Sequence, residues 1–433
     1  MSGVGQTTRN DGLPHGASRP EYHPAEGGTI VGRFLLFTVL LILYGSLFPF
    51  HFGVRAEIPH PLWTLTHNWP AIDRNFCRDV VVNVLLYMPL GVLVFVWLRG
   101  KLAPLQAAAL GLAGGALLSG SMEFLQGFDR PRQPSPTDII TNILGTAAGI
   151  ALARSYENAL ARFSRDAALR AALRPSGAWL LLLFWAAGQT SPFFPSLGLF
   201  AFRQKCMAFW NFEAFHWTDV LVSAIACLAV GRLLEAVAGA RAALRLLPFV
   251  LLLVPAKMLI QDRNLQLEEA LGAVCAGLAW GYGFWRYRGR TLLLAWLSVA
   301  ALVVRGLAPY HFRAAAGPFS WLPFGATLSY DYAAAMQPIL EKGFLYGSII
   351  WLFWAAGRRY FAATIGVTAL LAAIECVQRY LPGRTAEITD PVYALLLAMM
   401  LRWLDTVAAR RRELSAELAE KTIEPPMNTD KRR

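Results

Sequence analysis

Residues 80–98 read VVVNVLLYMPLGVLVFVWL, and this run decides the fold class. It contains one amide side chain, Asn83, and no charged residue. A helix rises about 1.5 Å per residue, so the run is long enough to cross a hydrocarbon core of ~30 Å. Backbone polar groups in lipid are satisfied only within helices or closed barrels, and the run lacks the alternation of a barrel strand. We therefore predict a membrane-spanning helix.

Similar apolar runs recur along the whole chain, which has 433 residues and is 56% hydrophobic and 16% charged. Soluble domains carry roughly 25% charged residues, so water is not the main solvent of this protein. We predict an all-α, polytopic transmembrane helix bundle of about twelve helices in the lipid bilayer. The predicted spans are 31–50, 80–98, 105–126, 138–153, 177–194, 217–236, 243–261, 267–285, 292–309, 339–356, 360–380 and 388–404.

The basic residues lie mainly between these spans. The chain has 40 Lys and Arg against 28 Asp and Glu, which gives a net charge of +12. If the N-terminus is cytoplasmic, the inner segments hold more than twice as many basic residues as the outer ones, as the positive-inside rule requires. The bias predicts an even number of spans with both termini in the cytoplasm. It also explains the positive charge without a nucleic-acid partner.

The segments outside the spans are polar. Residues 1–29 and 406–433 are predicted to be disordered cytoplasmic tails, because they contain few residues that could build a core. Residues 156–176 are predicted to be a basic cytoplasmic linker. Cys77 and Cys206 fall in predicted outer loops, so a disulfide between them is one possibility.

Motifs for cofactors and metals are absent from the sequence. It has no phosphate-binding loop and no His-Glu-x-x-His zinc pair. It also lacks the Gly-x-Ser-x-Gly turn of serine hydrolases and any Cys-x-x-Cys pair. We therefore expect neither a cofactor nor a metal.

The first and last thirds of the chain share a spacing of polar residues. Glu123, Gln126, Arg132 and Asp138 are matched, each 252 residues later, by Glu375, Gln378, Arg384 and Asp390. Fixed periods of this kind indicate internal repeats. We predict three units of four helices, at residues 30–155, 177–290 and 292–405, of which the middle one is a degenerate copy.

The candidate ligand-binding residues lie toward the predicted outer ends of the first and third units. They are Asp79, Asn83, Tyr87, Glu123, Gln126, Arg132, Asp138 and Asn142 in the first, and Lys342, Tyr346, Glu375, Gln378, Arg384 and Asp390 in the third. An acid within a span costs roughly 2.5–3.5 kcal/mol at the helix centre. Glu123 should therefore face a partner or a wet cavity, and Arg132 is the expected partner.

Each acidic residue also has a purely structural interpretation. Glu123 and Arg132 could pair only to fix a helical hairpin. Ser135, Pro136 and Asp138 fit a helix start, with Ser at the N-cap and an acid in the first turn. Catalysis is also left open, with Glu123, Asp138, Glu375 and Asp390 as the candidates for acid–base work.

Several of these motifs resemble the VanZ-like membrane family. They are Arg78-Asp79 to Asn83, Pro89-Leu90-Gly91, Ser121-Met122-Glu123-Phe124-Leu125-Gln126, Arg132 and Asp138 to Gly145, with similar runs at 341–347, 375–384 and Asp390. The middle unit departs from the pattern. The resemblance implies a multi-pass protein of the bacterial inner membrane and cell envelope. It also implies a link to tolerance of the glycopeptide antibiotic teicoplanin, but no defined reaction.

Three functions follow as alternatives. The leading one is binding of an anionic lipid or a lipid-linked envelope precursor in outward-facing pockets, where Arg132 and Arg384 grip phosphate or carboxylate. In that hypothesis Glu123 and Glu375, with their neighbouring glutamines, hold the arginines. The second is a membrane enzyme that acts on a lipid-linked substrate, with Glu123 and Asp138 as acid and base. The third is a twelve-helix transporter. The sequence does not define the oligomeric state.

Overall fold

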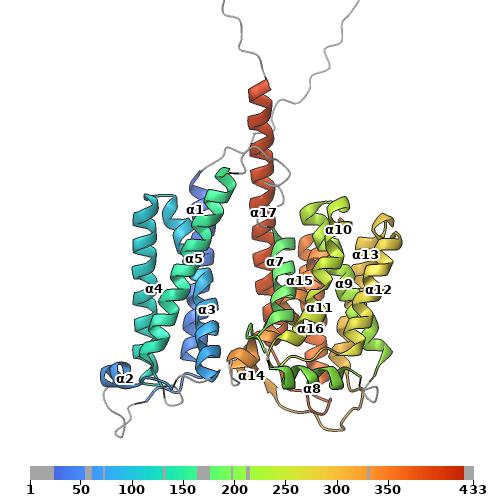
Figure 1. The fold of residues 1–433 in the computed structure, drawn as a ribbon, viewed down its shortest axis with the longest axis horizontal. Coiled ribbons are helices and arrows are strands. Elements are labelled where there is room, and N and C mark those ends of the chain that lie inside the picture. The colour runs from blue at the N-terminus through green and yellow to red at the C-terminus, as the bar shows by residue number, and fades with distance from the viewer. Residues whose placement is uncertain are drawn as a thin grey trace, which may run out of the picture.

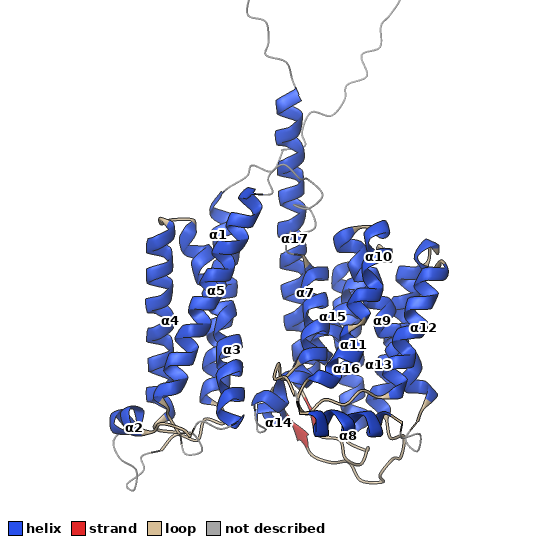
Figure 2. Cartoon of the chain, viewed as in Figure 1, coloured by secondary structure: helices blue, strands red, loops and turns tan. Residues whose placement is uncertain are grey.

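The computed structural model describes residues 24–53, 61–71, 74–129, 133–162, 176–196, 198–210, 215–328 and 332–423. This part of the chain is almost entirely helical (Figure 1). Figure 2 shows loops between the helices and a short pair of strands near the lower end of the molecule. The predicted all-α helix bundle is confirmed.

The N-terminal bundle lies on the left of Figure 1. It contains α1 (Pro24–Leu47), α2 (Pro61–His67), α3 (Arg74–Arg99), α4 (Pro104–Gln126) and α5 (Pro136–Arg162). Glycines bring α3 and α5 into close contact. A Cβ atom on Gly91 would lie 2.1 Å from the Thr146 carbonyl oxygen, and one on Gly149 would lie 2.1 Å from that of Met88. Small residues at helix interfaces are typical of packing in membranes.

The second bundle contains the rest of the described chain. Its helices are α7 (Gly177–Thr190), α8 (Leu199–Phe209), α9 (Trp217–Ala238), α10 (Ala240–Leu251), α11 (Leu253–Ala256), η1 (Lys257–Leu259), α12 (Leu267–Tyr282), η2 (Phe284–Arg286), α13 (Arg290–Leu307), α14 (Gly325–Leu328), α15 (Tyr332–Ala355), α16 (Tyr360–Gln378) and α17 (Thr389–Ile423). Residues of the predicted second and third units, such as Val230 and Leu352, pack into one buried apolar cluster. The two units therefore share a core.

The helices coincide with the predicted spans. Every predicted span overlies a helix or a consecutive set of helices. Six helical stretches are long and apolar enough to cross a membrane: Asp79–Arg99, Pro104–Gln126, Trp217–Ala238, Ala240–Leu259, Arg290–Leu307 and Tyr360–Gln378. The chain is a multi-pass membrane protein. The number twelve stays a prediction, and α7, with 14 residues, is about 21 Å long by helix geometry.

Three predicted boundaries require correction. α1 begins at Pro24, inside the predicted tail, and α5 continues to Arg162, inside the predicted linker. α17 continues to Ile423, so residues 406–423 are helical rather than disordered. The sequence there includes RRRELSAELAEK at 410–421. These are strong helix formers, and hydropathy does not report this propensity.

The lower end of the molecule in Figure 1 carries the short β-structure and three similar turns. Strands β1 (Phe319–Ser320) and β2 (Ala386–Glu387) pair in parallel, with Ser320 opposite Glu387. The turns follow α1, α7 and α13, and each contains a cis X-Pro bond followed by an aromatic residue with φ of 64°. These residues are Phe50, Phe193 and Tyr310, one in each predicted unit. The shared turn is consistent with the predicted repeat, which stays a prediction.

The cysteines do not form the disulfide that the sequence left open. All five are free thiols. Cys77 lies in α3 and Cys206 in α8 rather than in loops, because both helices extend beyond the apolar stretches from which spans were predicted.

Candidate functional site: two polar clusters at one end of the bundle

The N-terminal cluster is built around Glu123 in the last turn of α4, which is 3% exposed. Its Oε2 accepts a hydrogen bond from the Ser135 backbone N–H at 3.0 Å. One turn later, the Gln126 amide donates to the Ser46 carbonyl near the end of α1 at 2.9 Å. These two side chains tie α4 to α1 and to the chain that enters α5.

Asp138 occupies the first turn of α5, as the sequence predicts. The Asn83 amide of α3 donates to its Oδ1 at 2.9 Å. The Thr137 N–H donates to the Ser135 hydroxyl at 3.2 Å, which is the interaction expected of an N-cap serine. Asp138 therefore has a structural place at the helix start and a polar contact with α3 as well.

Two buried polar atoms among the predicted members of this cluster have no hydrogen-bond partner within the described residues. Tyr87 is 1% exposed, and its hydroxyl has no hydrogen-bond partner within the described residues. Asn142 donates to the Ser119 hydroxyl at 3.0 Å, while its Oδ1 has no partner in the same part of the chain. Asp79, the third member of the predicted α3 stripe, is exposed. Unpaired buried polar atoms are uncommon in proteins, so Tyr87 and Asn142 offer hydrogen-bonding capacity to a ligand or water.

One predicted member and one unpredicted member complete this cluster. Arg132 lies outside the described residues, and so does its predicted pair with Glu123. Asp129 was not predicted. It is 1% exposed, and its Oδ1 accepts a hydrogen bond from the His51 backbone N–H at 3.1 Å.

The C-terminal cluster repeats the first two interactions. Glu375, in the last turn of α16, is 3% exposed, and its Oε2 accepts the Glu387 N–H at 2.8 Å. The acceptor and donor are twelve residues apart, as Glu123 and Ser135 are. The Gln378 amide donates to the Gly306 carbonyl near the end of α13 at 2.8 Å. Strand β2 fixes Glu387 for its contact with Glu375.

Asp390, at the start of α17, is fully engaged by α15. Its Oδ1 accepts from the Lys342 ammonium at 2.6 Å, and its Oδ2 accepts from the Tyr346 hydroxyl at 2.6 Å. Asp390 is 6% exposed, and a buried carboxylate is tolerated when it is both paired and hydrogen-bonded. The Glu375 side chain also interacts with that of Asp390.

Arg384 does not pair with Glu375, so that prediction was wrong. Its Nε donates to the Ala308 carbonyl and its Nη2 to the Arg305 carbonyl, each at 3.0 Å. These carbonyls lie at the C-terminal end of α13, where backbone oxygens have no partner within the helix. A cationic side chain there satisfies the carbonyls and interacts favourably with the helix dipole.

The C-terminal cluster borders a cavity of about 380 Å³. All six predicted residues of the third unit line it: Lys342, Tyr346, Glu375, Gln378, Arg384 and Asp390. Sequence reasoning missed Arg305, Glu341 and Glu387, which line the same cavity. The Arg305 guanidinium makes no hydrogen bond and no ion pair within the described chain. The available signal for Arg305 was a basic residue at the predicted outer end of an apolar span.

Residues 28–160 match the family model described as VanZ/LLP1. This part of the chain is a VanZ-like domain. It covers α1 to α5 and therefore the whole N-terminal cluster, whereas the C-terminal cluster lies beyond the matched residues. No curated protein and no solved structure shows significant similarity to the chain.

Proposed function

We propose that this VanZ-like protein of the bacterial inner membrane binds an anionic headgroup, of a lipid or a lipid-linked cell-wall precursor, in its C-terminal cavity. The observation that carries the proposal is the exposed guanidinium of Arg305 in the cavity wall, which has no hydrogen-bond or ion-pair partner within the described residues. Lys342 and Arg384 line the same cavity. Arginine suits this role because its planar fork can bind phosphate or carboxylate through two hydrogen bonds.

The contacts within the cavity leave Arg305 as the cation available to a ligand. Lys342 is paired with Asp390, and two N–H groups of Arg384 donate to backbone carbonyls. One oxygen of Glu375 is bonded to the Glu387 N–H. An incoming anion would therefore meet Arg305 directly, with the remaining donors of Arg384 at the side.

The size and position of the cavity fit a headgroup. Its volume of about 380 Å³ lies in the range of roughly 300–1,000 Å³ that is typical of small-molecule sites. Arg305 and Gln378 lie at the ends of their helices, near the lower end of the bundle, and the described end of α17 lies at the opposite end (Figure 1). With the N-terminus in the cytoplasm, the cavity would face the outside, where envelope precursors are exposed.

The N-terminal cluster is proposed to be a second site of the same kind. Within the described residues of this cluster, the Tyr87 hydroxyl and the Asn142 Oδ1 have no partner and offer neutral hydrogen bonds to a ligand. In this proposal the three predicted units are repeats, and the headgroup is part of the envelope chemistry that underlies glycopeptide tolerance.

The proposal is tested by titrating the purified protein in a nonionic detergent with phosphatidylglycerol, undecaprenyl phosphate and diacylglycerol, followed by native mass spectrometry. We expect wild type to bind at least one of the two phosphate lipids at least ten-fold more tightly than diacylglycerol. Arg305→Gln should reduce that affinity about ten-fold, equivalent to about 1.4 kcal/mol. Arg203→Gln is the matched control, because Arg203 is an exposed arginine of α8 that lines neither this cavity nor the one described below. Equal affinities of wild type and a stable Arg305→Gln protein would contradict the proposal.

Enzymatic use of the cavity is a second candidate, because the neighbouring carboxyls of Glu375 and Asp390 both line it. One carboxyl could act as acid and the other as base on a bound lipid-linked substrate. Glu375→Gln should then abolish turnover of undecaprenyl-linked substrates while lipid binding persists. Unchanged product formation in that variant would exclude Glu375 as the acid or base.

A further inference from the structure

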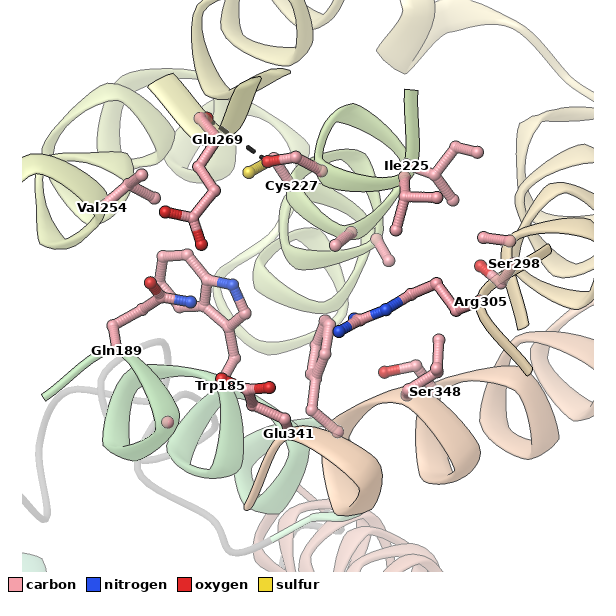
Figure 3. Close-up of a pocket in the computed structure, with 18 of the residues that line it drawn as sticks. Trp185, Gln189, Ile225, Cys227, Val254, Glu269, Ser298, Arg305, Glu341 and Ser348 are labelled. Carbon is pink, nitrogen blue, oxygen red and sulfur yellow. Dashed lines mark hydrogen bonds between the residues drawn. The ribbon is translucent and has the colours of Figure 1, made fainter. Parts of the chain in front are cut away.

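A second cavity of about 380 Å³ lies among α7, α9, α12, α13 and α15, in the region where the sequence predicts a degenerate unit (Figure 3). Figure 3 shows Glu269, Gln189, Glu341 and Arg305 reaching toward a common space from different parts of the chain. Arg305 and Glu341 border this cavity and the C-terminal one. The second cavity contains none of the residues predicted as site members.

Two ion pairs account for most of the charge around this cavity. Lys257 is 1% exposed, and its ammonium lies 2.6 Å from the Glu269 Oε1. The Arg263 guanidinium lies 3.6 Å from the Glu341 Oε1 and also donates to the Gly188 carbonyl at 3.1 Å. A lysine buried this deeply needs a partner, and Glu269 fulfils that requirement.

One charge of each sign remains after this pairing. Asp219, in the first turn of α9, lines the cavity, and its carboxylate has no hydrogen-bond or ion-pair partner within the described residues. Of the two cations that line this cavity, Lys257 is paired, and Arg305 has no partner in the part of the chain that the structure describes. Among the described residues that line this cavity, the charged groups without a partner are therefore one acid and one base.

Neutral groups of the wall add to this pattern. Ser348 is 2% exposed and lines the cavity, and its hydroxyl has no hydrogen-bond partner in the described chain. Gln189 also lines the cavity, and its Oε1 likewise has no hydrogen-bond partner in the described chain. Phe184, Trp185 and Phe344 form an aromatic part of the lining. Aromatic faces attract ammonium groups and exclude water from them.

We propose that this cavity binds a small zwitterion, with the ligand's ammonium group at Asp219 and its anionic group at Arg305. Asp219 and Arg305 are both exposed in the cavity wall. A ligand of this class could pair with both at once, whereas a pure anion has no group for Asp219. Ser348 and Gln189 would supply hydrogen bonds between the two charged ends. The ligand could be a free zwitterion or the headgroup of a zwitterionic lipid, because both present the same pair of charges.

This proposal shares Arg305 with the anionic-headgroup site, but it differs from that site in requiring Asp219. Asp219 lines only the second cavity, so replacing it tests the zwitterion alone. The comparison of phosphate lipids with diacylglycerol involves no amine, so its outcome does not depend on Asp219. Each proposal can therefore fail while the other holds.

The test is isothermal titration of the protein in a nonionic detergent with glycerophosphoethanolamine, a zwitterion, and with glycerophosphoglycerol, which lacks the amine. A second arm uses dihexanoyl phosphatidylethanolamine to detect a site that requires acyl chains. We expect the ethanolamine compound to bind wild type at least ten-fold more tightly than its glycerol counterpart in one of the arms. Asp219→Asn should abolish that preference.

The matched control is Asp262→Asn. Asp262 is an exposed carboxylate that lines neither cavity, and its φ of 56° is a conformation that asparagine tolerates. It should retain the preference for the ethanolamine compound. Absence of such a preference in wild type, or its persistence in a folded Asp219→Asn protein, would overturn the proposal.

Discussion

The N-terminal and C-terminal clusters share the same pattern of hydrogen bonds to the backbone, which we call the frame, but they differ in the side chains around the aspartate. In each, a buried glutamate accepts the N–H of the residue twelve positions later, and a glutamine three residues on donates to a carbonyl near the end of an earlier helix. In each, an aspartate at a helix start is bonded by a neighbouring helix. The frame thus depends on hydrogen bonds to the backbone, which fix the positions of loops and helix ends.

The two clusters differ in the side chains that donate hydrogen bonds to the aspartate. Asn83 donates one neutral hydrogen bond to Asp138, and the Tyr87 hydroxyl stays unpaired among the described residues. Lys342 and Tyr346 occupy both oxygens of Asp390. The same arrangement therefore presents an amide of α3 to the aspartate in one bundle and an ammonium of α15 in the other, so the ligand preferences of the two clusters should differ.

The largest expected effect is on the frame of the VanZ-like domain. Gly91→Ala places a Cβ atom 2.1 Å from the Thr146 carbonyl oxygen, so α3 and α5 must separate. Overpacking against backbone should destabilise the domain by about 3 kcal/mol. Unfolding in mixed micelles of sodium dodecyl sulfate and dodecyl maltoside would measure this loss.

Gly120→Ala is the matched control, because its added Cβ would meet nothing within 4 Å. Alanine favours helix over glycine by about 1 kcal/mol, so this variant should be as stable as wild type or more so. Equal stability of Gly91→Ala and Gly120→Ala would show that α3 and α5 are not packed as described.

The next effect tests whether the two clusters use their glutamates in the same way. Glu123→Ala and Glu375→Ala each leave a backbone N–H without its acceptor. Each should lose about 2 kcal/mol of unfolding free energy, since an unsatisfied buried donor costs about 1–3 kcal/mol.

The corresponding Gln variants keep an acceptor oxygen and should lose less. The same micelle titration measures all four proteins. A large loss in only one of the two alanine variants would break the comparison, because it would mean that one glutamate does not support its loop.

The smallest effect separates the Lys342–Asp390 ion pair from the Asn83–Asp138 hydrogen bond. Lys342→Met removes the cation from Asp390, and Asn83→Leu removes the amide from Asp138. Each should cost about 1 kcal/mol, since the Lys342 side chain is 39% exposed and water weakens its pair.

Salt distinguishes these two variants. The cost of Lys342→Met should fall between 50 mM and 500 mM sodium chloride, because salt screens exposed ion pairs. The cost of Asn83→Leu should not change. The same salt response in both variants would show that charge does not distinguish the clusters.

Much of the fold follows from the sequence, because runs such as residues 80–98 satisfy the length and hydropathy of a span. Helix ends were less predictable. α17 continues well past its apolar stretch, through residues with high helix propensity, and α8 has too few apolar residues for a span.

The candidate site was predicted in part. The spacing of Glu375, Gln378, Arg384 and Asp390 led to residues that all line one cavity. The partner of Arg384 could not be predicted, because backbone carbonyls carry no sequence signal. Arg305 and Asp219 were missed for a related reason. What distinguishes them is a charged side chain without a partner among the described residues, and only the three-dimensional neighbours reveal this.

Mass spectrometry of copurified lipids tests the central claim most directly, with wild type compared with the Arg305→Gln, Arg384→Gln double variant. We predict that anionic lipids, or a lipid-linked phosphate, are enriched with wild type relative to the bulk membrane and are depleted at least several-fold from the variant. Identical lipid profiles from two equally stable proteins would contradict the assignment of the C-terminal cavity as an anionic-headgroup site.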